Sequence, residues 1–180
     1  MQDILLVIDM QTDFVDGALG TAEAVQIVPA VAARIEEAVA RGEAVYFTRD
    51  THQENYLDTQ EGKKLPVVHC VQGTPGWEII PQLRGYAQGR PVIDKPSFGS
   101  TRLAELLAAE NEREPIRQIT LIGLCTDICV ISNALLVKAR LPEVPILVDA
   151  ACCAGVTPDS HQNALAAMRM CQIDVLNDDR

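Results

Sequence analysis

Two cysteines, Cys125 and Cys129, lie four residues apart in the segment Gly123–Val130. The strand-forming run Gln118–Ile122 comes before them, and a helical pattern begins near Asp127. This order of strand, turn and helix places a nucleophile at the carboxyl end of a parallel strand. A thiol in the first turn of a helix also feels the positive end of the helix dipole, which lowers its pKa and favours the thiolate. The segment alone leaves a second interpretation open, because a free cysteine is often a small buried hydrophobe.

An acid and a lysine follow two other predicted strands. Asp9 comes directly after the apolar run Ile4–Ile8, and Lys95 follows a short strand predicted at 91–94. A carboxylate can take the proton of a thiol, an ammonium group can stabilise the thiolate, and the thiolate can attack an acyl carbon. Backbone N–H groups beside the cysteine can then bind the oxyanion. Alone, Asp9 also fits a turn and Lys95 a solvated surface charge, so their placement together with Cys129 decides between the interpretations.

Alternating strands and helices are predicted to hold these residues. Strands are expected at 4–8, 44–48, 91–94, 116–122, 144–148 and 173–176, and helices at 27–41, 77–83, 100–109, 127–140 and 158–170. The pattern predicts an α/β fold with three layers, α/β/α, and a mainly parallel central sheet. The stretch 49–75 is long, polar and irregular, and such a loop in a compact domain is usually functional.

The polar residues that follow the strands are expected to meet at one edge of the sheet. Ligand sites in such sheets form beyond the carboxyl ends of the strands. The residues concerned are, in chain order, Asp9, Asp50, His52, Lys95, the pair Cys125 and Cys129, and Asp149. Residues 9–14 contain no glycine, so the sequence does not predict the phosphate-binding loop of dinucleotide folds.

The bulk composition is that of a well-packed globular chain. It has 180 residues, of which 48% are hydrophobic, and we expect a single domain over 1–180. A formal net charge of -10 argues against nucleic acid or an anionic membrane as partner. The sequence shows no apolar stretch of transmembrane length and no signal-peptide pattern, and its six cysteines, without a CxxC pair, are expected to be reduced. We therefore expect a cytoplasmic enzyme or binding protein.

Three segments in order resemble the isochorismatase-like cysteine hydrolases, and within that family the nicotinamidases. The segments are Leu6–Phe14, Asp94–Phe98 and Gly123–Val130. Their order and spacing match over roughly residues 4–175, and three motifs in the correct order are far more specific than any one of them. The resemblance implies the isochorismatase-like hydrolase fold for nearly the whole chain.

The resemblance also implies an active site. It assigns a catalytic triad to Asp9, Lys95 and Cys129, with Cys129 rather than Cys125 as the nucleophile. It implies a cis peptide bond between Leu124 and Cys125. The backbone N–H groups of Cys125 and Cys129 would then form the oxyanion hole.

Two further segments resemble the metal-binding segments of nicotinamidases. These are Asp50-Thr51-His52 and the stretch that begins at His69. The resemblance implies a divalent ion held by Asp50, His52 and His69, with zinc as first choice and iron or manganese as alternatives. Glu61 lies in the same loop, where some members of the family add a carboxylate. The simpler alternative is that His52 and His69 are loop histidines bonded to the backbone.

The resemblance also bears on the substrate. Phe14 and Phe98 match pocket aromatics of the family, whereas Pro66 stands where nicotinamidases usually carry an aromatic residue. The implied reaction is hydrolysis of a small carboxamide, nicotinamide or a similar amide, to the acid and ammonia through a thioester. The expected partner is thus a small molecule, and because the family commonly forms dimers or tetramers we expect a homo-oligomer. Two alternatives are an isochorismatase-type hydrolase of a different small substrate and a non-catalytic metal-binding homologue.

Several neighbouring residues are expected to have structural roles. Asp127 is expected to cap the helix that carries Cys129, and His161 to be a structural group on a helix face. Cys152 and Cys153 are expected to pack beside the site.

Overall fold

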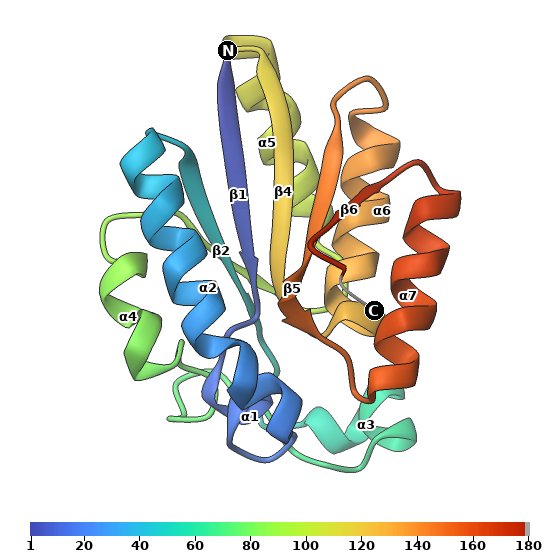
Figure 1. Cartoon of the computed structure of the whole chain (residues 1–180). Helices are drawn as coiled ribbons and strands as arrows, with labels where there is room; N and C mark the ends of the chain where they lie inside the picture. Colours follow the sequence, from blue (N-terminus) through green and yellow to red (C-terminus); the bar gives the residue numbers. More distant parts are fainter. Residues whose placement is uncertain (179–180) are drawn as a thin grey trace.

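The computed structural model describes residues 1–178 and is built around one sheet of six strands (Figure 1). The strands are β1 Gln2–Ile8, β2 Ala44–Asp50, β3 Val92–Lys95, β4 Ile116–Leu124, β5 Ile146–Ala154 and β6 Asp174–Leu176. They lie in the order β3-β2-β1-β4-β5-β6, and the neighbouring strands pair in parallel. The predicted parallel sheet is confirmed.

Helices cover both faces of this sheet, as Figure 1 shows. The α-helices are α1 Thr12–Val15, α2 Ala22–Arg41, α3 Gln60–Lys64, α4 Pro81–Ala87, α5 Thr101–Arg113, α6 Ile131–Arg140 and α7 Pro158–Met170. A 3-10 turn, Tyr56–Asp58, precedes α3, and a π-helical turn, Thr126–Val130, precedes α6. Helices α2 and α4 pack on one face and α5, α6 and α7 on the other, which confirms the three layers. Within residues 1–178, no helix combines the length and the apolar character that crossing a bilayer requires.

The central strand β1 is buried on both faces. Leu5 and Val7 pack in the apolar cluster that contains Ile35 of α2, whereas Leu6 and Ile8 pack in the cluster that contains residues of α5, α6 and α7. Successive side chains of a strand point to opposite faces, so a strand between two helical layers needs an unbroken apolar run. The sequence shows this run at 4–8, which explains why β1 could be predicted.

The winding of the chain changes direction between β1 and β4. From β1 the chain moves outward to β2 and β3, then returns to the other side of β1 and continues through β4 to β5 and β6. Ligands bind at such a switch point, beyond the carboxyl ends of the strands. Gly123 lets β4 approach β1 there: its φ is 113°, and a Cβ atom at this position would lie 2.1 Å from the carbonyl oxygen of Ile8. Asp9, the residue directly after β1, has a φ of 47°, a left-handed conformation that is unusual for a residue other than glycine.

Several helix boundaries differ from the predicted ones. Helix α2 begins at Ala22 instead of 27, because the hydroxyl of Thr21 accepts a hydrogen bond from the backbone N–H of Ala24 and caps an earlier start. Helix α4 begins at Pro81 instead of 77, and the helix predicted from 127 opens with the π-helical turn. Helices α1 and α3 were not predicted, because segments of four and five residues are too short to show a helical period.

The end of β5 also differs, and this corrects the position of Asp149. The strand continues to Ala154 instead of ending at 148, and its register against β4 shifts after Val148. Asp149 therefore lies within the strand, where its carboxylate accepts a hydrogen bond from the side-chain amide of Asn177 at 3.0 Å. The prediction that Asp149 joins the other polar residues at the edge of the sheet is wrong.

Candidate active site and metal centre

Asp9, Lys95 and Cys129 come together at the carboxyl ends of β1, β3 and β4. Asp9 directly follows β1, Lys95 is the last residue of β3, and Cys129 lies in the π-helical turn after β4. Lys95 Nζ is 2.7 Å from Asp9 Oδ2 and 3.4 Å from Cys129 Sγ. Each of these residues is at least 97% buried, with exposed fractions of 0%, 0% and 3%. The structure thus places the predicted acid, lysine and thiol in one buried cluster.

The surroundings of Asp9 suit a general base. The hydroxyl of Thr48 donates a hydrogen bond of 2.6 Å to Asp9 Oδ1, and Lys95 contacts the other carboxylate oxygen. Burial raises the pKa of Asp9, and the positive charge of Lys95 only partly opposes this effect. Burial alone would lower the pKa of Lys95, but the negative charge of Asp9 and of the groups beside it raises it, so the ammonium group stays protonated. A carboxylate with a raised pKa accepts a proton more readily during a reaction.

The thiol of Cys129 does not rest as a thiolate. Burial raises its pKa well above the ordinary value, and the nearby charge of Asp9 raises it further, although Lys95 acts in the opposite direction. The expectation that a helix dipole lowers this pKa is wrong in direction, because the thiol is enclosed within the protein instead of lying at an open helix end. A reaction of Cys129 as a nucleophile would require a nearby group to accept this proton, and the carboxylate of Asp9 acts directly on the thiol.

The peptide bond between Leu124 and Cys125 is cis, as the resemblance implied. Cys125 begins the π-helical turn, and its carbonyl oxygen accepts hydrogen bonds from the backbone N–H groups of Ile128 and Val130, at 3.1 and 3.0 Å. Burial raises the pKa of Cys125 to about 12, so this second thiol stays protonated at neutral pH. The oxyanion hole formed by the N–H groups of Cys125 and Cys129 stays a prediction.

Asp127 does not cap the helix, which corrects the prediction. Neither the π-helical turn nor α6 has a side-chain cap. The carboxylate of Asp127 instead accepts hydrogen bonds from the backbone N–H of Val156, at 3.2 and 3.3 Å, and joins the turn to the loop before α7. His161 is buried on α7 with Nδ1 2.8 Å from the hydroxyl oxygen of Thr126, in agreement with the expected structural role.

Asn133 holds the turn that carries Cys129 and was not identified from the sequence. Its side-chain amide donates hydrogen bonds to the carbonyl oxygens of Cys129 and Phe98, at 2.7 and 3.0 Å, and accepts one from the backbone N–H of Ser100 at 2.9 Å. Asn133 is fully buried at 0% exposure. One side chain thus joins the turn of Cys129 to the segment that carries Phe98. An asparagine inside a helix gives no sequence signal for such a role.

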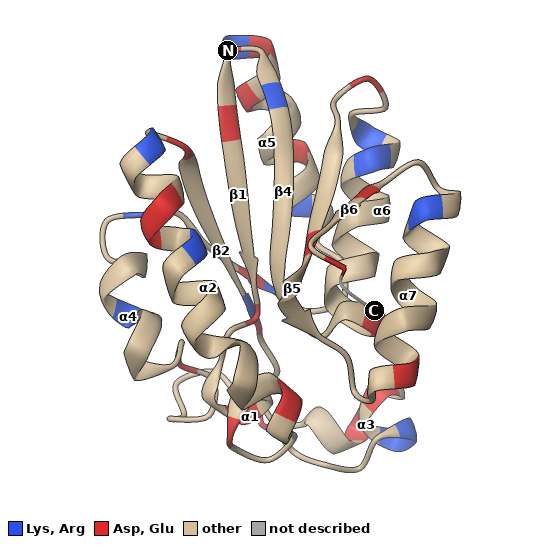
Figure 2. Cartoon of the chain, in the orientation of Figure 1, with Lys and Arg blue, Asp and Glu red and all other residues tan. Residues whose placement is uncertain are grey.

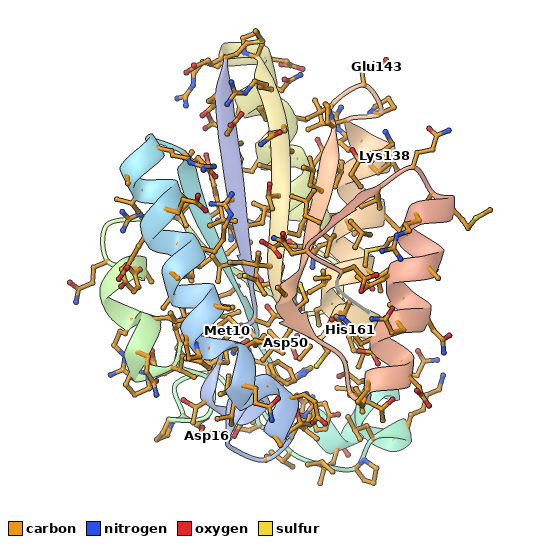
Figure 3. All side chains as sticks on the ribbon, in the orientation of Figure 1. Met10, Asp16, Asp50, Lys138, Glu143 and His161 are labelled. Atoms are coloured by element: carbon orange, nitrogen blue, oxygen red, sulfur yellow. The ribbon has the colours of Figure 1, made fainter. Side chains whose placement is uncertain are left out.

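A second group of side chains lies next to the triad and has the composition of a metal site. Asp50, His52, Glu61 and His69 each offer one ligand atom, and these atoms lie within 4.8 Å of one another. Asp50 Oδ2 is 2.9 Å from His52 Nε2 and 3.7 Å from His69 Nε2. Glu61 Oε1 is 3.6 and 3.9 Å from the same two nitrogens. Figure 3 shows Asp50 at the same end of the sheet as Met10 and His161. The structure thus brings together the three implied ligands and Glu61, the further carboxylate that the resemblance offered.

The donor atoms of this group fit a divalent ion. His69 Nδ1 is 2.7 Å from the carbonyl oxygen of Val67 and donates its N–H there, which leaves Nε2 as the ring nitrogen that faces the carboxylates. His52 Nε2 is buried and close to Asp50 but not aligned for a hydrogen bond with it. Burial alone would raise the pKa of Asp50, but its contacts with the two histidines hold that pKa well below the usual range. Two imidazole nitrogens with ionised carboxylates are the ligands that zinc, iron and manganese accept in proteins.

Gln11 and Asp13 hold residues of the candidate metal site in place, and neither was predicted to do so. The side-chain amide of Gln11 donates to the carbonyl oxygen of Asp50 at 2.8 Å and accepts from its backbone N–H at 2.7 Å. The carboxylate of Asp13 accepts a hydrogen bond of 2.8 Å from the backbone N–H of Cys70, the residue after His69. Both lie in the first segment that resembles the family, and that place in a motif is the signal that could have identified them.

A cavity of about 390 Å³ opens onto both groups. The predicted pocket residues Phe14 and Phe98 line it, together with the two cysteines Cys125 and Cys129. The remaining lining residues are Leu19, Asp50, Gln60, Glu61, Lys64, Leu65, His69, Ser97 and Ile128. A cavity of this size admits a small organic molecule. Cys152 and Cys153 are buried near the end of β5, where Cys153 pairs with Gly123 of β4, and they do not line this cavity.

Comparisons with known proteins agree with this geometry. The model of the isochorismatase domain family matches residues 3–179. The nicotinamidase of Schizosaccharomyces pombe is 28% identical, over 97% of this chain and 92% of that protein. Among solved structures, a pyrazinamidase of Pyrococcus horikoshii in complex with zinc is 26% identical with a TM-score of 0.82, covering 98% of this chain and 99% of that one. A nicotinamidase of Bacillus subtilis is also 26% identical, with a TM-score of 0.83, covering 98% and 100%.

Proposed function

The chain belongs to the isochorismatase domain family and is an amide hydrolase, and on this premise we propose that it cleaves a small carboxamide to the carboxylic acid and ammonia through a thioester on Cys129. The relatives that support this reaction act on nicotinamide and pyrazinamide, as their names state. Nicotinamide is therefore one candidate substrate of this chain, and other small amides are candidates too.

The proposed reaction uses the triad for proton transfer and attack. Asp9 takes the proton of Cys129 as the sulfur attacks the carbonyl carbon, and the N–H groups of Cys125 and Cys129 bind the oxyanion. Asp9 then gives this proton to the leaving nitrogen, the C–N bond breaks, and ammonia departs from the thioester. In the second half, Asp9 takes a proton from water, the resulting hydroxide attacks the thioester, and the proton returns to the sulfur as the acid leaves. Lys95 keeps the charge of Asp9 balanced throughout.

The second group of residues would hold a metal ion beside this reaction. Asp50, His52 and His69, with Glu61 as a fourth ligand, suit a divalent ion, for which zinc is the first choice and iron or manganese are alternatives. When bound, such an ion would act as a Lewis acid and would polarise and orient a polar group of the substrate. The four side chains fix where that polar group would lie in relation to Cys129.

One observation carries the proposal: a single ammonium group, Lys95 Nζ, contacts both Asp9 Oδ2 at 2.7 Å and Cys129 Sγ at 3.4 Å. An isochorismatase-type hydrolase would need no thiol at this position, and a non-catalytic metal-binding homologue would need no buried acid, lysine and thiol in contact. Burying charged groups costs desolvation free energy, so a protein without a reaction to catalyse gains little from such a cluster. The arrangement therefore favours acyl transfer over both alternatives.

Ammonia release from a panel of amides tests the proposal. The purified protein is supplied with zinc, iron(II) or manganese(II) in separate assays and mixed with nicotinamide, pyrazinamide, benzamide and aliphatic amides. We expect ammonia from at least one amide, and trapping by acid quench followed by mass spectrometry should find an acyl adduct on Cys129. If no amide of the panel yields ammonia with any of the metals, the proposed reaction is wrong.

Two further expectations accompany the proposal. We propose that residues 1–180 act as one domain and that the protein forms a homo-oligomer, a dimer or tetramer. Light scattering coupled to gel filtration measures the mass in solution, and a monomer at assay concentration would contradict the second expectation.

A further inference from the structure

Lys64 is a cation of the cavity that the proposed mechanism does not use. It is the last residue of α3, it is exposed to solvent, and it lines the cavity with Gln60 and Glu61 of the same helix. In Figure 2 the end of α3 is blue, at the end of the sheet where β1 and β2 end. Residues three and four apart lie on the same side of a helix, so α3 directs both Glu61 and Lys64 toward the cavity.

The acidic groups of the cavity already have partners, whereas Lys64 has none among residues 1–178. The carboxylate of Asp50 contacts Lys95 and the two histidines, and Glu61 lies 3.6 and 3.9 Å from those histidines. Among residues 1–178, no side chain or carbonyl group forms an ion pair or hydrogen bond with Lys64, although Glu61 is only three positions away. The positive charge of Lys64 is thus available to a molecule that enters the cavity.

Cys129 and Lys64 line the same cavity, and five apolar side chains line it with them: Phe14, Leu19, Leu65, Phe98 and Ile128. A molecule whose amide carbon lies at Cys129 would place a hydrocarbon part against apolar side chains of this set. A charged group at the other end of that molecule would lie in the cavity that Lys64 lines.

We propose that Lys64 binds a negatively charged group of the substrate, so that the enzyme acts on primary carboxamides that carry a carboxylate at the opposite end of a short apolar spacer. This proposal rests on the amide hydrolysis proposed above and specifies its substrate class. A charged hydrogen bond between an ammonium and a carboxylate is stronger than a neutral one, which makes Lys64 a specificity-determining residue. The whole chain carries a formal net charge of -10, which repels an anionic substrate, so a cation that lines the cavity favours its binding.

Matched pairs of amides test the proposal. Isophthalamate is compared with meta-toluamide, and adipamate with hexanamide, so that a methyl group replaces the carboxylate in each pair. The measured quantity is the ratio of kcat/KM for the charged amide to kcat/KM for the neutral one. The variants are Lys64→Gln, Lys64→Glu and the control Lys63→Gln, since Lys63 is an exposed neighbour on α3 that does not line the cavity.

We expect the unmodified enzyme to favour the charged member of at least one pair. Lys64→Gln should lower the ratio about tenfold, mainly through KM, because it removes one charged hydrogen bond. Lys64→Glu should lower it further through repulsion, and Lys63→Gln should leave it within about twofold because a solvated charge outside the cavity is screened. A preference for the neutral amides, or a ratio that Lys64→Gln does not change, would overturn the proposal even if the enzyme hydrolyses amides.

A binding measurement separates this proposal from the proposed reaction. Calorimetry on the metal-loaded Cys129→Ala protein gives the Kd for isophthalamate and for meta-toluamide without turnover. Adding Lys64→Gln should weaken binding of isophthalamate about tenfold, and adding Lys63→Gln should not. If no amide yields ammonia, the reaction is wrong but this measurement still decides the role of Lys64. If isophthalamate binds equally in all backgrounds, Lys64 has no such role.

Discussion

The two halves of the site are held in place by different means. The thiol half, Asp9, Lys95 and Cys129, lies at or directly after strands β1, β3 and β4, so the hydrogen-bonded sheet determines its geometry. In the metal half only Asp50 ends a strand, and its other members come from the stretch 52–69. That stretch contains two short helical segments and is otherwise irregular.

The loop of the metal half is positioned by individual side chains instead of a sheet. Asp13 binds the backbone N–H of Cys70, and the hydroxyl of Tyr56 donates to the carbonyl oxygen of Leu65 at 2.8 Å. Gly62 lies so close to Tyr56 that a Cβ atom would be 2.1 Å from its carbonyl oxygen. Because each contact acts alone, we expect substitutions outside the ligands to disturb the metal half, whereas the thiol half should depend mainly on its own members.

The largest expected effect is on the thiol half. Cys129→Ala removes the nucleophile and should lower amide hydrolysis by a factor on the order of 10⁴ or more, as loss of a nucleophile does in other hydrolases. Ammonia release measures the effect, and metal analysis should show that this variant binds as much metal as the unmodified protein. Cys125→Ala is the matched control, because it keeps the backbone N–H and should retain most activity. Loss of metal from Cys129→Ala would show that the halves are not separable.

The next effect is on the metal half. Loss of a residue that only supports a metal ligand weakens metal binding by up to about a hundredfold. His69→Ala removes a ligand itself, so it should weaken metal binding by more than this. Competition with a chromophoric chelator measures the affinity, and thermal unfolding of the metal-free proteins checks that the fold persists. Undiminished metal binding by His69→Ala would remove this residue from the proposed ligand set.

A smaller effect is expected from a support of the metal half. The two carboxylate oxygens of Asp13 accept hydrogen bonds from the backbone N–H groups of Cys70 and Ala18. In Asp13→Asn one oxygen becomes an N–H₂ group, which cannot accept a hydrogen bond, so one of these two contacts is lost. We expect metal affinity to fall up to about tenfold, the effect of one lost hydrogen bond at a partly buried position. Asp16→Asn, an exposed change nearby, is the control. Equal affinities in the two variants would mean that Asp13 does not position the loop.

The smallest expected effect is on a support of the thiol half. Thr48→Val removes the hydroxyl that donates to the Asp9 carboxylate and stabilises its charged form, so the pKa of Asp9 rises further. Since the base must be ionised, the acidic limb of the pH profile of kcat/KM should move to higher pH, with activity at neutral pH reduced up to about tenfold. Thr48→Ser should restore the profile. An unmoved acidic limb would mean that Asp9 is not the base that this limb reports.

The same contrast explains how much of the site could be predicted from the sequence. Asp9 directly follows an apolar run, Lys95 ends a short strand, and Cys129 lies in the turn after another strand. A pattern of buried strands therefore locates Asp9, Lys95 and the segment of Cys129. The same pattern places Asp50 and His52 at this edge of the sheet. Glu61 and His69 were identified only through resemblance, because no periodic pattern places either of them near Asp50. The role of Lys64 had no signal in the sequence, since it depends on where a five-residue helix packs.

The wrong predictions also have local physical causes. Asp149 follows the last large apolar residue of its strand, but β5 continues through small residues after a shift in register. Asp127 has the sequence position of a helix cap, but the turn there is π-helical and its carboxylate binds Val156 instead. Register shifts and turn types depend on neighbouring chain segments, which a local sequence pattern does not describe.

Lys95 belongs to both halves, because its Nζ lies 2.7 Å from Asp9 and 3.3 Å from Asp50. The two sites therefore share one positive charge, and their equilibria must be thermodynamically linked. If occupancy of the metal half changes the affinity of the thiol half for a ligand by some factor, then that ligand changes metal affinity by the same factor. A reversible inhibitor that binds covalently to Cys129 should consequently shift the metal dissociation constant, and this reciprocal shift would report the coupling through Lys95 without any turnover.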